Sequence, residues 1–507
     1  MKFGPKSTVM AILTAAALAL TACGGGGTST NGGAATTTLT IGQLQDLVSF
    51  EPADAHIGHT MPYYQAVYDS LILRAPDGEL KPMIAESWEY NADNTVLTLK
   101  LRTDVTFSDG AKLDAAAVKA NLDHFKKAQG RDAYQVASLG SVAVVDPATV
   151  AITLSKADPA FTYYLSLAAG LMGSPAALGT PGIKTVPAGS GPYELDTTNT
   201  VKGSQYVFTK RANYWNKDLQ KFDKVTMKFL ADVTARTNAI VSGQIDATLL
   251  DPKTSKQAVA AGLTLTTSQV DWQGLLLMDR DGKVTPELAN PKVRQAMNFA
   301  FDRKTILEQQ YLGEGTPTSQ VFGPESGAYV DELDSSYSYD PAKAKALLAE
   351  AGYPNGFELK IPTMTGFEAI TATVQQQLGD IGIKVQLETI PQANYVPDLA
   401  AAKYSAAVFN LYQAEPWVAI NQMISTSALY NPFKSTTPEL ATMIDAVQNG
   451  GEQSAEKAKE VNKYVTNNAW FVPFFRLNQM YLTNKKITVE PQLQQAIPSL
   501  YNYAPAK

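Results

Sequence analysis

A single cysteine in 507 residues, Cys23, limits how this chain can hold itself together, because no disulfide can form within one copy. The fold must therefore be stabilised by buried apolar side chains. A chain of this length exceeds what one hydrophobic core normally organises, which predicts at least two lobes. Strand-like and helix-like segments alternate along the sequence, and this alternation favours an α/β fold.

Cys23 also ends an apolar run at the start of the chain. Two lysines precede residues 9–22, VMAILTAAALALTA, a run too short to cross a bilayer comfortably as a helix and typical of a secretion signal. Leu20 stands three residues before the cysteine with small residues between, so residues 1–22 resemble a bacterial lipoprotein signal. The resemblance implies cleavage before Cys23 and a diacylglyceryl anchor on its sulfur. An ordinary signal peptide with an accidental cysteine is the alternative.

Residues 23–37 are predicted to be a flexible tether. They contain no charge and no large apolar side chain, so burial cannot offset the entropy of ordering them. We expect an extracytoplasmic protein, lipid-anchored to the outer face of the cell membrane, on the periplasmic side if an outer membrane is present. Removing the signal leaves 40 basic and 48 acidic side chains, a balance that argues against nucleic acid as a partner.

Local patterns place several elements. Leucines alternate with polar residues over 95–102, which predicts a half-buried strand, and Asp114 is positioned to cap a following helix. Residues 142–154 predict a β-hairpin. Proline follows Asn or Asp at 290–291 and at 340–341, a pairing that indicates helix starts.

Catalytic motifs are scarce. His56 and His59 have a spacing that a metal could use, but no cysteine or intervening glutamate accompanies them, which favours a polar loop; His124 is expected on a helix surface. Ser190 lacks the Gly-x-Ser-x-Gly pattern, and no glycine loop for phosphate or dinucleotide follows a strand. We therefore expect no enzyme activity, cofactor or metal. A pair of carboxylates for glycoside hydrolysis stays open among 48 acids.

Motifs spread over the chain resemble family 5 of the bacterial extracellular solute-binding proteins. Tyr68-Asp69-Ser70-Leu71 followed by residues 81–88, KPMIAESW, is similar to the family's Y-x-x-L and P-x-(I/L)-A-E-S-W pattern. Further similar stretches occupy residues 99–110, 189–193, 211–215, 242–246, 293–303, 340–352 and 375–385. The likeness covers essentially residues 38–507. It implies a receptor that delivers peptides, nickel or oligosaccharides to ABC importers.

The resemblance implies a periplasmic-binding-protein-like α/β fold, type II in its large cluster C form, with a hinge between two lobes. Strands near 269–278 and 471–481 would cross between the lobes, and ligand would sit between them and favour closure. The implied divisions are lobe I, residues 38–270 and 475–507 with a subdomain at about 55–185, and lobe II, residues 271–474.

Two stretches resemble the family's ligand-lining segments. Asp46-Leu47-Val48 precedes a match to the family's S-L-D-P, and in relatives this backbone can pair with a bound peptide as an added strand. Residues 409–416, FNLYQAEP, align with W-x-x-D-x-x-(D/E)-P, where the aspartate of peptide-binding relatives receives the amino terminus. This chain has Tyr412 there, and a neutral hydroxyl cannot match an ammonium as a carboxylate does.

Two alternatives follow for the cargo. Glu415, Asp46 or Asp271 could replace the missing charge, or the cargo could be a neutral compound such as a sugar held on aromatic rings. The candidate ligand residues are Asp46, Leu47, Val48, Trp272, Phe409, Asn410, Tyr412, Glu415 and Trp417. We predict a monomeric receptor that captures an oligopeptide or peptide-like solute for an ABC permease. An oligosaccharide receptor, an exported hydrolase and a signalling or adhesion lipoprotein are the alternatives.

Overall fold

The computed structural model describes residues 37–56 and 58–506. The predicted signal peptide, Cys23 and all but the last residue of the predicted tether lie outside them. The described residues belong to one compact unit. Within this described part, no helix is both long and apolar enough to span a membrane.

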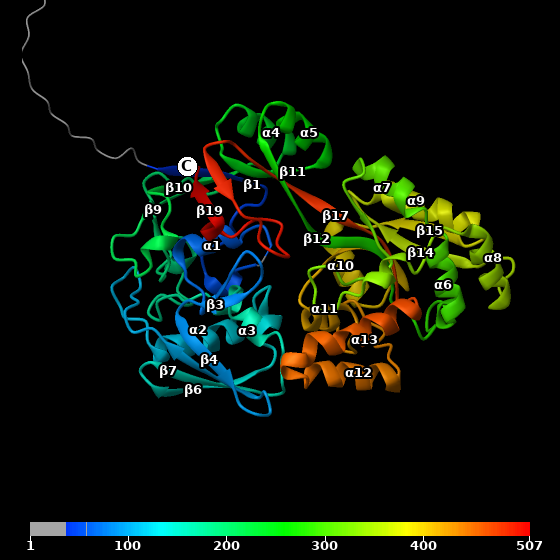
Figure 1. Ribbon diagram of the computed structural model, residues 1–507, viewed down its shortest axis with the longest axis horizontal. Coiled ribbons are helices and arrows are strands. Elements are labelled where there is room, and N and C mark those ends of the chain that lie inside the picture. Colours follow the sequence, from blue (N-terminus) through cyan, green and yellow to red (C-terminus); the bar gives the residue numbers. More distant parts are fainter. Residues whose placement is uncertain (1–36, 57, 507) are drawn as a thin grey trace, which may run out of the picture. The chain divides into compact units, whose positions relative to one another are not determined.

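A nine-stranded mixed sheet is the main element (Figure 1). Only β1 is parallel to its neighbours, β10 and β11; the other pairs are antiparallel. The order along the sheet is β16 (Ala406–Tyr412), β12 (Thr264–Leu277), β17 (Phe471–Thr483), β11 (Ala247–Leu250), β1 (Thr38–Gln43), β10 (Lys224–Phe229), β9 (Gln205–Lys210) and β8 (Tyr193–Leu195), and β13 (Gly315–Pro317) pairs with β17.

The two segments predicted to cross between lobes are the two longest strands. β12 and β17 pair antiparallel from Thr264 opposite Thr483 to Leu276 opposite Phe471, with two register shifts. Residues 480–483 of β17 pair with β11, and residues 271–277 of β12 pair with β16. These two strands therefore connect β16, at one end of the sheet, with the strands that begin at β11. Assignment of the lobes to either side of them stays a prediction.

A second antiparallel sheet forms from the first third of the chain. The predicted strand, hairpin and helix are all present, and the Asp114 carboxylate accepts a hydrogen bond from the N–H of Ala117 at 2.9 Å. The elements of this region are β4 (Ala85–Tyr90), β5 (Val96–Leu101), β7 (Thr149–Leu154) and β6 (Leu139–Asp146) in sheet order, with α1 (Met61–Val67), β2 (Ile72–Arg74), β3 (Leu80–Pro82), α2 (Ala115–Ala128) and α3 (Phe161–Tyr164).

Helices dominate the second half. The helix starts predicted at 290–291 and 340–341 are confirmed, since Asn290 and Asp340 accept hydrogen bonds from the N–H groups of Lys292 and Lys343. The remaining elements are α4 (Val233–Val241), α5 (Pro252–Ala260), α6 (Pro291–Phe299), α7 (Arg303–Tyr311), α8 (Pro341–Glu350), β14 (Glu358–Thr363), α9 (Glu368–Asp380), β15 (Lys384–Thr389), α10 (Gln392–Ala400), α11 (Pro416–Met423), α12 (Pro438–Gln448), α13 (Ser454–Asn467), β18 (Ile487–Val489) and β19 (Tyr503–Pro505).

The part of the sheet formed by β12 and β16 separates two cores. Side chains alternate across a strand, so Trp272 and Leu411 pack into one core while Leu275 and Val408 pack into the other. β12 is therefore apolar on both faces over its second half, as the unbroken run of leucines in its sequence requires.

Two arginines, Arg294 on α6 and Arg303 at the start of α7, are buried. Their guanidinium groups donate to backbone carbonyls, among them those of Leu288 and Pro473. Five N–H donors on a rigid plane suit this role, because they satisfy several loop carbonyls at once.

Candidate functional site

β16 is the outermost strand of the main sheet at one end. It pairs with β12 so that Asp271 lies opposite Tyr412 and Gln273 opposite Asn410. The N–H of Gln413 donates to the carbonyl of Val270 at 2.8 Å, which makes that pair hydrogen-bonded. Because hydrogen-bonded and non-hydrogen-bonded pairs alternate, the backbone groups of Asn410 and Tyr412 point away from β12, toward the free edge.

At this edge one outward carbonyl accepts a hydrogen bond from within the protein. The Tyr395 hydroxyl donates to the carbonyl of Val408 at 2.7 Å and lies 3.4 Å from that of Pro362 on β14. Among residues 37–56 and 58–506, none hydrogen-bonds to the outward N–H or C=O of Asn410 or Tyr412. An unpaired strand edge is a template for another extended chain.

The Tyr412 side chain reaches a residue 249 positions earlier. Its hydroxyl lies 2.8 Å from that of Tyr163 on α3. Burial raises the pKa of both phenols, so both stay protonated and one can donate to the other. The Arg74 guanidinium lies 5.0 Å from the centre of the Tyr163 ring, a cation–π distance. The contact joins the end of β16 to the first third of the chain.

Two carboxylates flank Tyr412 in sequence or across the sheet. Glu415 directly precedes α11, and burial raises its pKa although the charge of Arg74 opposes this. Asp271 is opposite Tyr412, and burial raises its pKa to about 6 with no opposing charge. In the described part of the chain, neither carboxylate has a hydrogen-bond donor or an ion-pair partner within 4 Å. Negative charge is therefore available near the open edge.

The predicted residues Phe409 and Asn410 are held by their neighbours. Phe409 is half-buried and stacks on Tyr395, with ring centres 5.9 Å apart, and its centre lies 5.1 Å from that of Tyr430. The Asn410 side chain accepts a hydrogen bond from Gln273 at 2.7 Å. Phe409 is thus partly exposed beside its aromatic neighbours, while the side chain of Asn410 is fixed by Gln273.

The two predicted tryptophans lie inside the protein. Trp272 is fully buried, its ring centre 5.8 Å from that of Phe471, and its indole N–H has no partner among the described residues. Trp417, on α11, is only 4% exposed, and its indole N–H hydrogen-bonds to Asp158. In this arrangement neither indole presents a free face, and a ligand role for them stays a prediction.

The predicted segment Asp46-Leu47-Val48 follows β1. Asp46 accepts hydrogen bonds from the N–H of Leu47 at 2.8 Å and from the Tyr206 hydroxyl at 2.9 Å. Leu47 is buried and Val48 is 80% exposed. No hydrogen bond or ring contact within the described residues joins this segment to Tyr412, so its role as a ligand-lining strand stays a prediction.

The three histidines occupy different surroundings. His56 lies 3.0 Å from Asp132, while burial and nearby positive charge lower the pKa of His59 to about 4. His124 was expected on the surface, and this is wrong: it is half-buried and hydrogen-bonds to Glu51 at 2.9 Å, because α2 packs this face inward. The described residues contain no group of three or more His, Cys, Asp or Glu that could hold a metal.

Sequence reasoning missed three residues of this site. Tyr163 and Tyr395 contact β16 or its side chains, and Arg74 contacts Tyr163. Tyr163 and Arg74 lie far from β16 in sequence, and Tyr395 lies within an ordinary helical pattern. The only sequence signal was the abundance of tyrosine, 23 residues, which did not single out any of them.

Comparison with known proteins agrees with this fold. The family model described as bacterial extracellular solute-binding proteins, family 5 Middle, matches residues 79–431. The glutathione-binding protein GsiB of Escherichia coli K12 is 34% identical over 364 residues, covering 68% of this chain and 67% of GsiB.

Solved structures show the same architecture. The binding protein AgaA from A. tumefaciens R10, in complex with agropinic acid, is 24% identical with a TM-score of 0.76, covering 93% of this chain and 99% of AgaA. DppA from Helicobacter pylori, in complex with the peptide STSA, is 21% identical with a TM-score of 0.77, and covers 93% and 99%. The predicted periplasmic-binding-protein fold is confirmed. The chain therefore belongs to family 5 of the bacterial extracellular solute-binding proteins, the solute receptors of ABC importers.

Proposed function

We propose that this receptor captures an oligopeptide or peptide-like solute on the open edge of β16 and delivers it to an ABC permease. The observation that carries the proposal is the pair of outward backbone positions, Asn410 and Tyr412, whose N–H and C=O groups have no partner in the described structure. An extended peptide adds to such an edge as a further strand, with its main chain supplying both donors and acceptors. A sugar offers no such repeat.

The charges near this edge support a free amino terminus on the cargo. Tyr412 replaces the aspartate of peptide-binding relatives, but Asp271 lies directly opposite it and Glu415 follows three residues later. Both carboxylates are desolvated and unpaired, a state that costs free energy and that an ammonium group would relieve. Glutathione, which GsiB binds by its name, is itself peptide-like.

Closure follows from the same contacts. The hydrogen bond between Tyr163 and Tyr412 joins α3 to the end of β16, so a solute on β16 that also contacts α3 binds both parts. A ligand shifts the equilibrium only through contacts that differ between states, and contacts to both parts exist only when they are together. Release of an unaltered solute makes the protein a receptor and not an enzyme.

An N-methyl scan of penta-alanine tests the edge pairing. In an added strand only alternate N–H groups face β16, so methylation should weaken binding with a period of two, by about tenfold at the facing positions. Isothermal titration calorimetry measures the dissociation constants, and mass spectrometry of the mixture checks that the peptide stays intact. Methylation at the intervening positions is the matched control. Equal losses at every position, or cleavage of the peptide, would contradict the proposal.

The anchor at Cys23 is a separate part of the proposal and lies outside the described residues. Two or more acyl chains hold a protein durably at a bilayer, and the adjoining segment would leave the lobes beside their transporter. Labelling cells with an alkyne-bearing palmitate should mark the wild-type chain and not a Cys23→Ser variant. Labelling of both chains would show that the lipid is attached elsewhere.

A further inference from the structure

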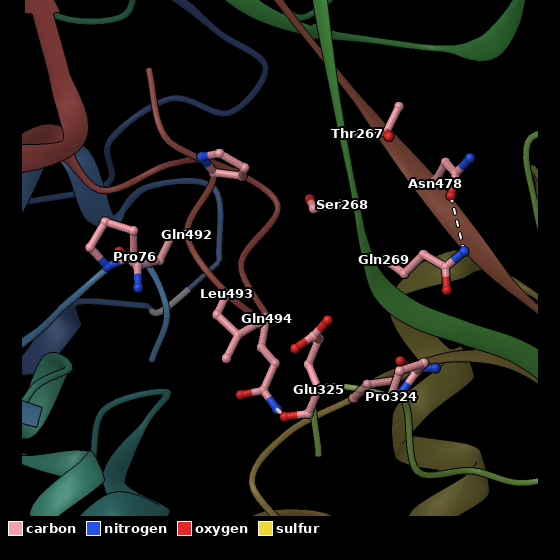
Figure 2. Close-up of a pocket in the computed structure, with 12 residues that line it drawn as sticks. Pro76, Thr267, Ser268, Gln269, Pro324, Glu325, Asn478, Gln492, Leu493 and Gln494 are labelled. Carbon is pink, nitrogen blue, oxygen red and sulfur yellow. Dashed lines mark hydrogen bonds between the residues drawn. The ribbon is translucent and has the colours of Figure 1, made fainter. Parts of the chain in front are cut away.

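β17 runs from the proposed cargo site to a lysine-rich end of the main sheet. Asn478 of β17 lines a cavity that is also lined by Gln413, the residue after Tyr412, so this cavity belongs with the cargo site (Figure 2). Beyond Asn478 the strand continues to its end, and Lys485 and Lys486 follow it. Both side chains are exposed, and in the described part of the chain neither ammonium has a hydrogen-bond or ion-pair partner.

The described chain begins at this same end of the sheet. The Thr37 N–H and hydroxyl donate to the Asp223 carboxylate at 2.9 and 3.1 Å, and the Thr37 carbonyl accepts from the Asp223 N–H at 2.9 Å. The next residue starts β1 and is paired with Lys224, the first residue of β10. These bonds fix the point at which the chain coming from Cys23 enters the compact unit, and we call it the entry point.

Strand directions explain why the two ends meet. β1 and β11 are parallel and β17 is antiparallel to β11, so the end of β17 lies beside the start of β1. Backbone hydrogen bonds continue this pairing, from Asp246 to the Thr40 carbonyl at 2.7 Å and from Asn484 to the Asp246 carbonyl at 2.9 Å. Lys485 and Lys486, which follow Asn484, therefore lie near the entry point.

Three more lysines reach the entry point from the other side. Lys224 is opposite Thr38, and Lys210 ends β9, which runs antiparallel to β10. The Lys221 ammonium donates to the Tyr501 carbonyl at 3.1 Å, just before β19. Figure 1 shows β1, β10 and β19 in the same part of the molecule. The entry patch, as we define it, comprises Lys210, Lys221, Lys224, Lys485 and Lys486.

The entry patch carries positive charge that nearby acids do not neutralise. Three of these acids already have partners of their own: Asp223 with Thr37 and Lys210, Asp246 with Thr40 and Asn484, and Glu194 with Arg211. The adjoining pair Lys217-Asp218 adds no net charge. The patch is therefore locally positive, although the mature chain has 48 acidic and only 40 basic side chains.

We propose that the entry patch binds the anionic headgroups of the bilayer that holds the chain through Cys23. The proposal rests on the anchor in the proposed function and not on the cargo. Thr37 is 14 residues from Cys23, so even a fully extended chain keeps the entry point within about 50 Å of the bilayer. At the resulting effective concentration weak attractions are sufficient, and each ammonium within about 10 Å of an anionic surface adds to them.

The spread of the lysines matches a bilayer better than a single ion. Headgroup phosphates present an extended layer of negative charge, which lysines from separate segments can meet together, whereas a free phosphate ion meets only one or two of them. Binding through the entry patch turns the start of β1 toward the bilayer. It thereby sets the orientation in which the receptor meets a permease in the same membrane.

Lysine footprinting on vesicles tests this surface. The mature chain, residues 23–507, has one thiol, so Cys23 can be coupled to a maleimide lipid in vesicles of phosphatidylcholine alone or with about 30% phosphatidylglycerol. N-acetoxysuccinimide acetylates exposed amines, and mass spectrometry gives the rate at each lysine. Lys224, Lys485 and Lys486 should react about threefold more slowly on the anionic vesicles, an effect lost in about 0.5 M NaCl. Lys304, whose side chain is 81% exposed on α7, should react equally on both.

Matched triple variants locate the charge responsible. Combining Lys224→Gln, Lys485→Gln and Lys486→Gln should reduce the protection of Lys210 and Lys221 from about threefold to less than about 1.5-fold. Circular dichroism establishes that each variant is folded. The control variant changes three exposed lysines elsewhere and should leave the protection of the entry patch intact: Lys304→Gln, Lys345→Gln and Lys384→Gln.

The possible outcomes separate this surface from its alternatives. Equal rates on both kinds of vesicle at the entry patch, or equal slowing at Lys304, would overturn the proposal. So would slowing by about 10 mM glycerol phosphate on neutral vesicles, which indicates a site for free phosphate, or protection on native membranes alone, which indicates a protein partner. A footprint without palmitate labelling in cells would support the surface and count against the anchor. Labelling without a footprint would overturn the surface and leave the anchor standing.

Discussion

Two carboxylates beside the crossing strands have opposite surroundings. Asp334 faces Arg476 on β17, whose guanidinium donates to both of its oxygens, one of them at 2.9 Å, and it also accepts from Thr318 at 2.7 Å and Gln320 at 2.9 Å. Asp271 on β12, opposite the residue after Arg476, has no hydrogen-bond donor among the described residues.

The pKa values follow from this difference. Burial alone would raise the pKa of Asp334, but hydrogen bonds from Arg476 and Thr318 outweigh it and the pKa is lowered. Burial raises the pKa of Asp271 to about 6 because nothing opposes it. A satisfied buried network fixes one packed arrangement, whereas an unsatisfied acid costs stability and is free to take a ligand. We therefore expect Asp334 to serve the structure, and Asp271 stays a proposed site residue.

Arg476→Met should give the largest effect. Its side chain is 1% exposed, and its loss removes the cation that pairs with the Asp334 carboxylate and one donor to the Thr318 hydroxyl. Removing one partner of a buried ion pair is strongly destabilising, so we expect a loss of about 3 kcal/mol in the free energy of unfolding, measured by urea denaturation.

A matched surface variant calibrates that number. Lys304→Met removes a cation whose side chain is 81% exposed and should change the unfolding free energy by less than about 0.5 kcal/mol. Peptide affinity of folded Arg476→Met, measured where it is fully native, should stay within about threefold of wild type. Unchanged stability with lost affinity would reverse the assignment of the two acids.

Asp271→Asn should have a smaller effect of opposite sign. Because the folded-state pKa is raised above the ordinary value near 4, the folded protein holds a proton there between about pH 4 and pH 6, and stability falls as pH rises through this window. At neutral pH the asparagine variant avoids that cost. We expect it to be more stable by roughly 1–2 kcal/mol there, and equal to wild type below about pH 4, by urea denaturation across pH.

The same variant separates charge from shape in peptide binding. If Asp271 receives an ammonium, Asp271→Asn should weaken a free-amine peptide about tenfold and leave its N-acetylated form unchanged. Glu358→Gln, which neutralises an exposed acid on β14, is the control and should alter neither. Equal losses for both peptides would show that Asp271 acts through packing.

Local features of this fold could be predicted from sequence because their causes lie within a few residues. The Asp114 carboxylate caps α2 by accepting a hydrogen bond from the N–H three residues ahead. In Asn290-Pro291 and Asp340-Pro341, the proline ring fixes the backbone angle φ at the first helical residue. The family resemblance located β16 and named Phe409, Asn410 and Tyr412. It could not show that the Asn410 backbone points to the free edge while its side chain binds Gln273, since that depends on which pairs with β12 are hydrogen-bonded.

Contacts between distant segments were beyond sequence reasoning. Tyr412 meets Tyr163 across 249 residues, and Arg476 meets Asp334 across 142. The burial of Trp272 has a similar origin: β12 is apolar on both faces, so alternation does not say which core an indole enters. Which strand lies at an edge, and which side chains enter each core, depend on the assembled sheet. These two features determine which aromatic rings remain exposed to a ligand.

Tyr412→Phe should give the smallest of these effects and tests the contact that joins β16 to α3. It removes one hydroxyl and leaves that of Tyr163 buried without its partner, at a cost of about 1 kcal/mol in unfolding free energy. A double-mutant cycle with Tyr163→Phe isolates the bond, and we expect a coupling of about 0.5–1.5 kcal/mol. If this hydrogen bond helps hold α3 against the end of β16, each single variant should also weaken penta-alanine binding by about two- to threefold. A coupling near zero would mean that the two hydroxyls contribute only packing, and that closure depends on the cargo alone.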